Sequence, residues 1–322
     1  MRKAGFAVLV LALAACGGSG GGGGMQHATL TLDWTPNPDH VGFYYARDEG
    51  IFRKVGLDVA IHAPSDPSSP LKLVGAGRSD LAVSYEQEVF LAAQKKLPVV
   101  AVASVIGQPL NSFMSIDPGI HTLADLKGRS VGITGVPADY AALESAGLRD
   151  DVKIVNVGYS LLPALLSHKV DAVLGVYRNV EGVELKQRGY NPTIIPLHRA
   201  GVPWYDELVL VANSDRLRSS KSYADMVGKF VDAFQTGQRE AYIHPDRSIE
   251  VLGKVTASKR SFLEASTRAT LPLLGQGCLE ISEWVRFGAW MYAHDLLKQR
   301  VPASEVMTRR YLGPQCKKHA AV

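Results

Sequence analysis

Cysteine is scarce in this chain, which has three among its 322 residues. Cys16, Cys278 and Cys316 are far apart and do not match the spacing of a zinc site, so no metal centre is expected. If Cys16 is set aside and the protein is exported, Cys278 and Cys316 can pair, because an oxidising compartment permits disulfides. The sequence leaves this disulfide and a pair of free thiols equally open.

Long apolar runs are also missing, apart from one near the start. Residues 4–13 are apolar and follow two basic residues, but they are too few to span a bilayer as a helix. They end in Leu-Ala-Ala-Cys, which resembles a bacterial lipobox, so we expect cleavage before Cys16 and lipidation of its thiol. The alternative is an ordinary secretory signal with a coincidental cysteine.

A glycine-rich stretch follows at residues 17–24, and it has the composition of a flexible spacer. We therefore predict a lipoprotein signal peptide at 1–15 and a lipidated cysteine with its spacer at 16–27. The mature protein is expected to be an exported cell-envelope lipoprotein, either periplasmic or on the outer face of the cytoplasmic membrane.

The chain has no large excess of charge of either sign. It has 35 basic and 31 acidic residues, a net charge of +4, and its basic residues form no stripe, so nucleic acid is not an expected partner. A glycine-rich phosphate loop, a paired metal motif and a G-x-S-x-G elbow are absent too. These absences predict no catalytic residue, no metal and no cofactor.

What the sequence does contain is a regular alternation of apolar strands and helical patterns from Thr29 to Arg188. This alternation predicts an α/β protein with mainly parallel sheets that helices cover on both faces. After residues 208–217 the pattern becomes a C-terminal helical segment, with helices near 223–243, 261–271 and 282–298. We predict two lobes, the first from 28–112 with 213–322 and the second from 113–212.

Ligands of open α/β sheets bind beyond the carboxyl ends of the strands, often between domains. In this chain three such positions, and a fourth just before the return strand, combine aromatic side chains with amides or carboxylates. The four groups are Trp34, Asn37 and His40; Tyr85, Glu86 and Glu88; Tyr177, Asn179 and Glu181; and Trp204, Tyr205, Asp206 and Glu207. Their recurrence predicts a site for a flat, polar ligand.

Residue spacing decides which of these side chains can act together. Glu86 and Glu88 are two apart on a predicted helix and do not converge, which argues against a glycosidase pair of carboxylates. Tyr85 and Glu88, three apart, share a face of that helix. In an extended segment Tyr205 and Glu207 share one face, and Asp206 points the other way.

Each position also has a purely structural interpretation. Trp34 can close the core, Asn37 between two prolines is a natural turn residue, and the carboxylates can be solvated surface groups. His40 is better explained as a residue that starts the following helix than as a ligand contact. Tyr44 and Tyr45 are expected in the core.

Four stretches together carry a family resemblance: LDWTPNPDHVGFYYARDEGIFRKVGLDV, SYEQEVFLAA, GVYRNVEG and VPWYDELVLV. They resemble the thiamine-pyrimidine-binding proteins of bacterial ABC importers, which are related to the eukaryotic thiamine pyrimidine synthase. The resemblance covers residues 30–217, and the helical tail matches mainly by position and length. It implies a two-lobe periplasmic-binding-protein fold of type II that closes on its ligand.

The resemblance also implies a ligand, partners and site residues. The implied ligand is a thiamine-precursor pyrimidine of the formylaminopyrimidine or hydroxymethylpyrimidine type. The implied partners are a permease and its ATPase. The protein itself is expected to be a monomer that binds the ligand without enzymatic activity. The implied ligand positions are Trp34, Asn37, Tyr85, Glu86, Glu88, Tyr177, Asn179, Tyr205 and Glu207. His40, Trp204 and Glu181 are implied only as neighbours of the ligand positions or as possible contacts.

This sequence differs from the synthase at positions that matter for synthase activity. The synthase has a cysteine-rich stretch where this chain has residues 202–206, and a lysine and a histidine where it has Ser84 and Glu88. Its phosphate loop corresponds to residues 133–140, which lack that character. Synthase activity is therefore not expected, and an unphosphorylated ligand is favoured.

Several alternative functions stay open. A riboflavin-binding protein would share the fold, as would a binding protein for another small solute. Nitrate or sulfonate is disfavoured because carboxylates repel anions. An exported hydrolase that uses His40 as its base would need an activated nucleophile, which the sequence does not offer.

Overall fold

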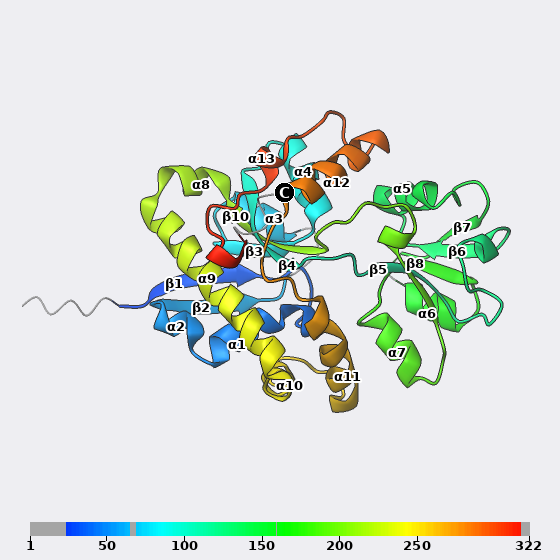
Figure 1. The fold of residues 1–322 in the computed structure, drawn as a ribbon, viewed down its shortest axis with the longest axis horizontal. Coiled ribbons are helices and arrows are strands. Elements are labelled where there is room, and N and C mark those ends of the chain that lie inside the picture. Colours follow the sequence, from blue (N-terminus) through cyan, green and yellow to red (C-terminus); the bar gives the residue numbers. More distant parts are fainter. Residues whose placement is uncertain (1–23, 65–68, 159, 317–322) are drawn as a thin grey trace, which may run out of the picture.

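The computed structural model describes residues 24–64, 69–158 and 160–316. The predicted signal peptide, Cys16 and nearly all of the glycine spacer lie outside the described residues. Two five-stranded sheets form the centres of two lobes that lie side by side (Figure 1). Helices cover both faces of each sheet, so the predicted two-lobe α/β fold is confirmed.

The first lobe is built on a sheet of order β2-β1-β3-β10-β4. Its strands are β1 (Gln26–Thr31), β2 (Leu57–His62), β3 (Leu81–Ser84), β4 (Val99–Ile106) and β10 (Leu208–Asn213). β1 pairs in parallel with β2 and β3, whereas β10 runs antiparallel to β3 and β4. All residues of β4 and β10 are buried, as expected for apolar strands covered on both faces.

The second lobe has a sheet of order β7-β6-β8-β5-β9. Its strands are β5 (Asn111–Ser115), β6 (Ser130–Ile133), β7 (Lys153–Asn156), β8 (Ala172–Tyr177) and β9 (Thr193–Pro196). β5 is antiparallel to β8 and β9, and β6 is parallel to β7 and β8. The chain therefore crosses between the lobes twice, after β4 and before β10.

The helices that precede β10 in the chain cover the two sheets. They are α1 (Val41–Asp48), α2 (Ile51–Lys54), α3 (Ser69–Gly75) and α4 (Glu86–Gln94) in the first lobe, and α5 (Pro137–Ser145), α6 (Leu161–Leu166) and α7 (Glu181–Gln187) in the second. A short 3-10 helix, η1 (Pro38–His40), precedes α1. Tyr44 and Tyr45 are buried on α1, as predicted.

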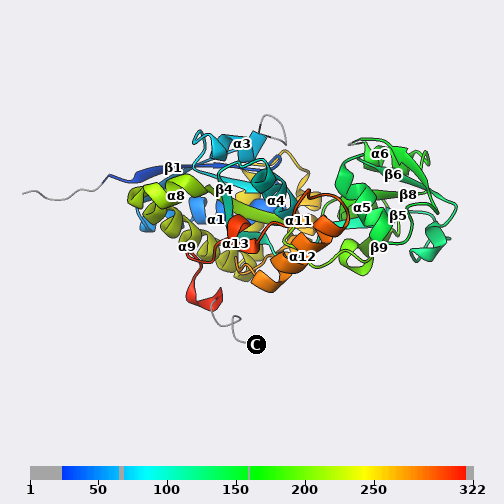
Figure 2. The ribbon, with the colours of Figure 1, turned by 90° about the horizontal axis from the view of Figure 1, so that it is seen from above.

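The rest of the chain is helical, as predicted. It forms α8 (Ser214–Ser219), α9 (Lys221–Ile243), α10 (Pro245–Gly253), α11 (Arg260–Thr270), α12 (Ile281–Ala293) and α13 (Ala303–Val306). The long helix α9 packs on α1, where the rings of Phe43 and Phe234 stack 4.2 Å apart. Figure 2 shows α12 beside α4, with its far end toward α5 of the second lobe.

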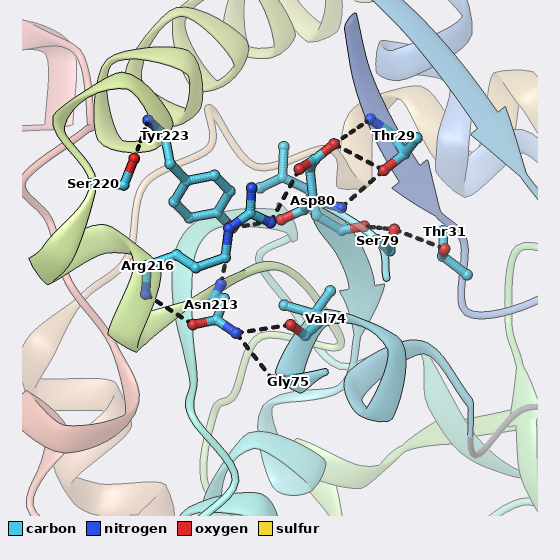
Figure 3. Close-up of polar contacts among 11 residues, drawn as sticks. Thr29, Thr31, Val74, Gly75, Ser79, Asp80, Asn213, Arg216, Ser220 and Tyr223 are labelled. Atoms are coloured by element: carbon cyan, nitrogen blue, oxygen red, sulfur yellow. Dashed lines mark hydrogen bonds and ion pairs between the residues drawn. The ribbon is translucent and has the colours of Figure 1, made fainter. Parts of the chain in front are cut away.

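Two further features hold the first lobe together. Cys278 and Cys316 form a disulfide, which the sequence had left open. At the amino-terminal end of β3, Asp80 joins β1 to the α8–α9 region (Figure 3). Its carboxylate accepts hydrogen bonds from the Thr29 amide at 3.0 Å and from Arg216 at 3.1 Å, and its backbone oxygen accepts from the Tyr223 hydroxyl at 2.6 Å.

Among the described residues, none of the helices is both long and apolar enough to cross a membrane.

Candidate functional site

Buried polar side chains gather at the carboxyl ends of β1, β3 and β8. Asp33, two residues after β1, is the first centre of this cluster. Its carboxylate contacts His40 Nε2 at 2.7 Å and accepts a hydrogen bond from the Tyr85 hydroxyl at 3.0 Å. The His40 ring is fully buried, and its Nδ1 faces the Asn37 amide at 3.3 Å, so Nδ1 accepts and Nε2 donates to Asp33.

The Asn37 side chain makes local contacts. Its Oδ1 accepts from the Asp39 amide at 2.8 Å, and its Nδ2 donates to the Thr35 carbonyl at 3.2 Å. Asn37 thus caps η1, the role expected of an asparagine at this position. In this conformation Asn37 acts as a turn residue and His40 helps to start the following helix, as expected. Ligand binding by Asn37 stays a prediction.

Asp39 and Asn179 connect the two lobes. Asn179, which follows β8, donates from Nδ2 to Asp39 at 2.7 Å and to Thr270 at the end of α11 at 2.8 Å. The Ser266 hydroxyl donates to the Asn179 backbone oxygen at 2.7 Å. Asp39 and Asn179 are each 1% exposed, and Asn179 Oδ1 has no hydrogen-bond partner among the described residues. Burial raises the pKa of Asp39 to about 7.

Glu207 lies at the junction between the lobes and accepts five hydrogen bonds. Oε2 accepts from the amides of Leu110 and Asn111 at 2.8 and 3.0 Å and from the Tyr205 hydroxyl at 3.0 Å. Oε1 accepts from Asn111 Nδ2 at 2.9 Å and from the Tyr177 hydroxyl at 3.2 Å. Burial raises the pKa of Glu207, and these hydrogen bonds oppose the rise. One carboxyl group thereby connects both crossing segments to β8.

The residues around Glu207 follow the predicted two-residue period. Tyr205 is buried, bonds to Glu207 and stacks on Phe287 of α12 at 4.8 Å. Asp206 points elsewhere, because its carboxyl oxygens accept from Ser104 at 2.7 Å and from Trp284 at 2.8 Å. The predicted pairing of Tyr205 with Glu207 and the opposite orientation of Asp206 are confirmed.

Glu86 is buried more deeply than a side chain that contacts a ligand at the surface of a cleft would be. It is fully buried, its Oε2 accepts from the Asp206 amide at 2.7 Å, and its Oε1 has no partner in the described part of the chain. Burial raises the pKa of Glu86 well above its ordinary value and that of Asp206 to about 7. The two carboxyl groups form an interior acidic pair beside α12, so a direct ligand contact by Glu86 would require a rearrangement.

The remaining predicted positions lie around this cluster. Trp34 is 46% exposed after β1. Glu88 is also exposed, yet desolvation by the surrounding protein raises its pKa. Glu181 accepts from the Tyr177 amide at 2.7 Å and so caps the end of β8. The Trp204 indole donates to the Gly107 carbonyl at 2.9 Å in the crossing segment.

Four residues of the cluster were not predicted from the sequence. Asp33 carried a usable signal, because it follows the first strand directly beside Trp34. Asp39 was obscured by its place in a proline-rich turn. Asn111 and Thr270 come from elements that offered no motif, and only the tertiary fold brings them to Glu207 and Asn179.

Among the described residues, no group of three or more His, Cys, Asp or Glu side chains is placed to hold a metal ion.

Comparison with known proteins identifies the family of this chain. A model of the family described as NMT1/THI5 like matches residues 37–248, a span that includes most of the cluster. The chain belongs to the NMT1/THI5-like family. It is 32% identical over 325 residues to the formylaminopyrimidine-binding protein of Halalkalibacterium halodurans, covering 94% of this chain and 96% of that protein.

Some of the relatives of this chain are named as enzymes. This chain is 28% identical over 165 residues to a 4-amino-5-hydroxymethyl-2-methylpyrimidine phosphate synthase of Saccharomyces cerevisiae, a match that covers 49% of this chain and 48% of the synthase. Among solved structures, the ligand-binding component of an ABC-type import system from Staphylococcus aureus has a TM-score of 0.68 at 15% identity. That match covers 92% of this chain and 99% of the other, and it shows that the two folds are alike.

Proposed function

We propose that this protein is the solute-binding lipoprotein of an ABC importer and captures a thiamine-precursor pyrimidine between its lobes. The observation that carries the proposal is the interlobe cluster of tyrosines, carboxyl groups and an asparagine at the strand ends. The similarity over nearly the whole chain to a formylaminopyrimidine-binding protein supports the ligand class. The fold shared with an ABC-type import component supports the transport role.

The chemistry of the cluster suits an aminopyrimidine. The exposed indole of Trp34 offers a flat face for a ring, and aromatic pairs of this kind contribute about 0.5–1.5 kcal/mol beyond area burial. Carboxyl groups accept hydrogen bonds from an exocyclic amine, and Asn179 Oδ1, which has no partner among the described residues, offers a further acceptor. Asp39, with a pKa of about 7, can donate as an acid or accept as a carboxylate near neutral pH.

Capture is proposed to work by closure of the lobes. Tyr177 and Asn179 come from the second lobe, while Asp33, Asp39 and Tyr85 come from the first. A ligand that contacts both sets has more contacts in the closed state, and this differential affinity shifts the population toward closure. The permease then reads the closed form, and no chemical step takes place.

Synthase activity is not part of the proposal. The positions that carry a lysine and a histidine in the resembled synthase are occupied here by Ser84 and Glu88. Ser84 is buried in β3 and Glu88 is exposed at the start of α4. Neither offers an amine or an imidazole, so this chain lacks both of the side chains that the synthase has at these positions.

The test is a ligand screen on the purified chain beginning at Gly24. Formylaminopyrimidine is expected to raise the Tm in proportion to the logarithm of its concentration, as a ligand specific for the native state must. Hydroxymethylpyrimidine and riboflavin are the comparison ligands. A shift with riboflavin alone would replace the ligand but keep the class, whereas loss of the pyrimidine to a product during incubation would contradict a binding role.

The lipid anchor is a separate proposal that rests on the sequence before the described residues. We expect the full-length chain to be found in the membrane fraction of a bacterial host and to incorporate a labelled fatty acid. Cys16→Ser is expected to abolish labelling and to leave the ligand-induced Tm shift unchanged. Labelling of the Cys16→Ser chain would exclude this anchor.

A further inference from the structure

The amino-terminal edge of the first sheet brings together five segments that are far apart in the sequence. At one side of this edge the Gln26 amide donates to the Gly56 carbonyl at 2.8 Å, and at the other the Ser214 amide donates to the Pro98 carbonyl at 3.0 Å. Between these contacts Asp80 joins β1 to the α8–α9 region (Figure 3). The segments that meet here are 24–27, 53–58, 76–80, 94–98 and 214–225.

Basic residues outnumber acidic residues in these segments by eight to four. The basic residues are Arg53, Lys54, Arg78, Lys95, Lys96, Arg216, Arg218 and Lys221, and the acidic residues are Asp58, Asp80, Asp215 and Asp225. The side chains of Arg53, Lys54, Arg78 and Lys96 are exposed and make no ion pair among the described residues. We call the five segments the basic edge.

The carboxyl groups in and beside the basic edge do not neutralise these four side chains. Those within it pair with other residues, namely Asp58 with His27, Asp80 with Arg216, Asp215 with Arg218 and Asp225 with Lys221. Asp48 and Glu49, just before α2, pair with Lys254 at 3.2 Å and with Arg247 of α10 at 2.7 Å. An excess of positive charge therefore remains at this end of the first lobe.

The basic edge is also where the chain leads to the proposed lipid anchor. Gly24 follows Cys16 by eight residues, and a chain of that length spans at most about 29 Å. Figure 1 shows the start of β1 at the end of the first lobe that is farthest from the second lobe, with α2 and α8 at the same end. The exposed side chain of Met25 lies there too. An anchor at Cys16 would hold the basic edge close to the lipid headgroups.

We propose that the basic edge docks on anionic lipid headgroups, so that the first lobe rests on the membrane surface. Lysine and arginine side chains near an anionic membrane are attracted to it within about one Debye length. A tether adds to this attraction by raising the effective concentration of the surface. The candidate ligand cluster lies at the opposite, carboxyl ends of the strands, so docking turns the cluster away from the bilayer.

The relevance of docking in the cell rests on the proposed lipid anchor, so the test leaves the anchor out. The chain from Gly24 is sedimented with vesicles of phosphatidylglycerol and phosphatidylcholine in equal parts, and with vesicles of phosphatidylcholine alone. Binding to the anionic vesicles is expected at about 0.01 M salt, where the Debye length is about 30 Å, and release at about 1 M, where it is about 3 Å. Little binding to the neutral vesicles is expected.

A double variant tests the location of the contact. Lys54→Gln with Lys96→Gln removes two unpaired charges from the two sides of the basic edge. It is expected to lower the partition coefficient on the anionic vesicles by about 25-fold, or about fivefold per charge. Arg53→Gln with Arg78→Gln removes the same charge and provides the test if the first double variant does not fold.

The matched control is Lys153→Gln with Lys169→Gln. Both lysines are exposed in the second lobe and make no ion pair among the described residues, so the control changes the net charge equally. It should bind the anionic vesicles about as well as the wild type does.

Three results would overturn the proposal. The first is no binding of the wild type to anionic vesicles at low salt, which would leave an acidic protein surface as the partner of the basic edge. The others are equal binding to neutral vesicles and an equal loss of binding in the control. Failure of the proposed anchor would be seen instead in the fatty-acid labelling of the full-length chain, which these vesicle measurements do not involve.

Discussion

At the scale of single residues, the buried carboxyl groups define the site more than the aromatic side chains do. Asp33, Asp39 and Glu207 each join residues that are far apart in the sequence. The type and spacing of the residues were enough to predict Tyr205 with Glu207 on one face. The other four of the five donors to Glu207 could not be predicted, because they come from residues that only the folded chain brings to it.

Replacement of Glu207 tests this carboxyl group as the tie between the two crossings. Glu207→Gln places an amide NH₂ where Leu110, Asn111 and two tyrosines donate, so at least one buried donor is left without an acceptor. We expect a loss of about 2 kcal/mol or more in the free energy of unfolding, measured by urea denaturation. Glu250→Gln, which alters an exposed ion pair with Arg247, should change it by less than about 0.5 kcal/mol.

The raised pKa of Asp39 predicts that the stability of the fold depends on pH. Its pKa is raised from 3.8 in its ordinary state to about 7 in the fold, so between these values the native state binds a proton that the unfolded state has lost. Stability therefore falls as pH rises through this window, with a limiting slope on the order of 1 kcal/mol per pH unit. Relative to Asp39→Asn, which cannot ionise, the wild type should lose stability between pH 5 and 7.

The measurement for Asp39 is the urea midpoint at several pH values for the wild type and the variant. Asp246→Asn is the control, because Asp246 lies on the surface and pairs with Arg268 there. Parallel curves for the wild type and Asp39→Asn would show that Asp39 titrates as an ordinary carboxyl group in the fold.

At the scale of elements, helix α9 carries much of the first lobe. Its periodicity predicted the helix well, since apolar residues recur at helical spacing over its whole length. What could not be predicted is its partner, because the α1–α9 contact depends on a close backbone approach at glycines. A Cβ at Gly237 would lie 2.4 Å from the Gly42 carbonyl oxygen and 2.7 Å from Ala46 Cβ.

Gly237→Ala is therefore expected to force α9 away from α1 and to lower the free energy of unfolding by about 1–3 kcal/mol. Gly228→Ala on the same helix meets only Tyr311, at 3.7 Å, and should be neutral or stabilising by up to about 1 kcal/mol, because alanine favours helix over glycine. Thermal unfolding of both variants gives the comparison. Equal effects of the two substitutions would contradict a close contact at Gly237.

At the scale of the whole molecule, alternation of strands and helices was enough to predict two α/β lobes, since it reflects burial on both faces of a sheet. The contacts between lobes could not be predicted in the same way. Asn179 bonds to Thr270 in the helical tail, where the family resemblance is weakest, and nothing local to either residue indicates the other.

The disulfide also acts on the whole molecule. It closes a loop between residues 38 apart in the sequence, and in the chain-entropy model such a loop contributes about 4 kcal/mol, with measured values commonly lower. Replacement of both Cys278 and Cys316 by serine should lower the Tm, and a reductant should lower the wild-type Tm to a similar value. The reductant should leave the Tm of the double variant unchanged, and a drop there would point to another cause.

The place of β10 in the first sheet has a consequence for biogenesis. β10 lies between β3 and β4, so the first sheet cannot close until residue 213 has left the ribosome or the translocation channel. All five strands of the second sheet come from residues 111–196, and they emerge earlier as one uninterrupted segment. The second lobe can therefore begin to fold before β10, an interior strand of the first sheet, is available to β3 and β4. A chain that ends between β4 and β10 would leave edges of β3 and β4 unpaired and prone to aggregate.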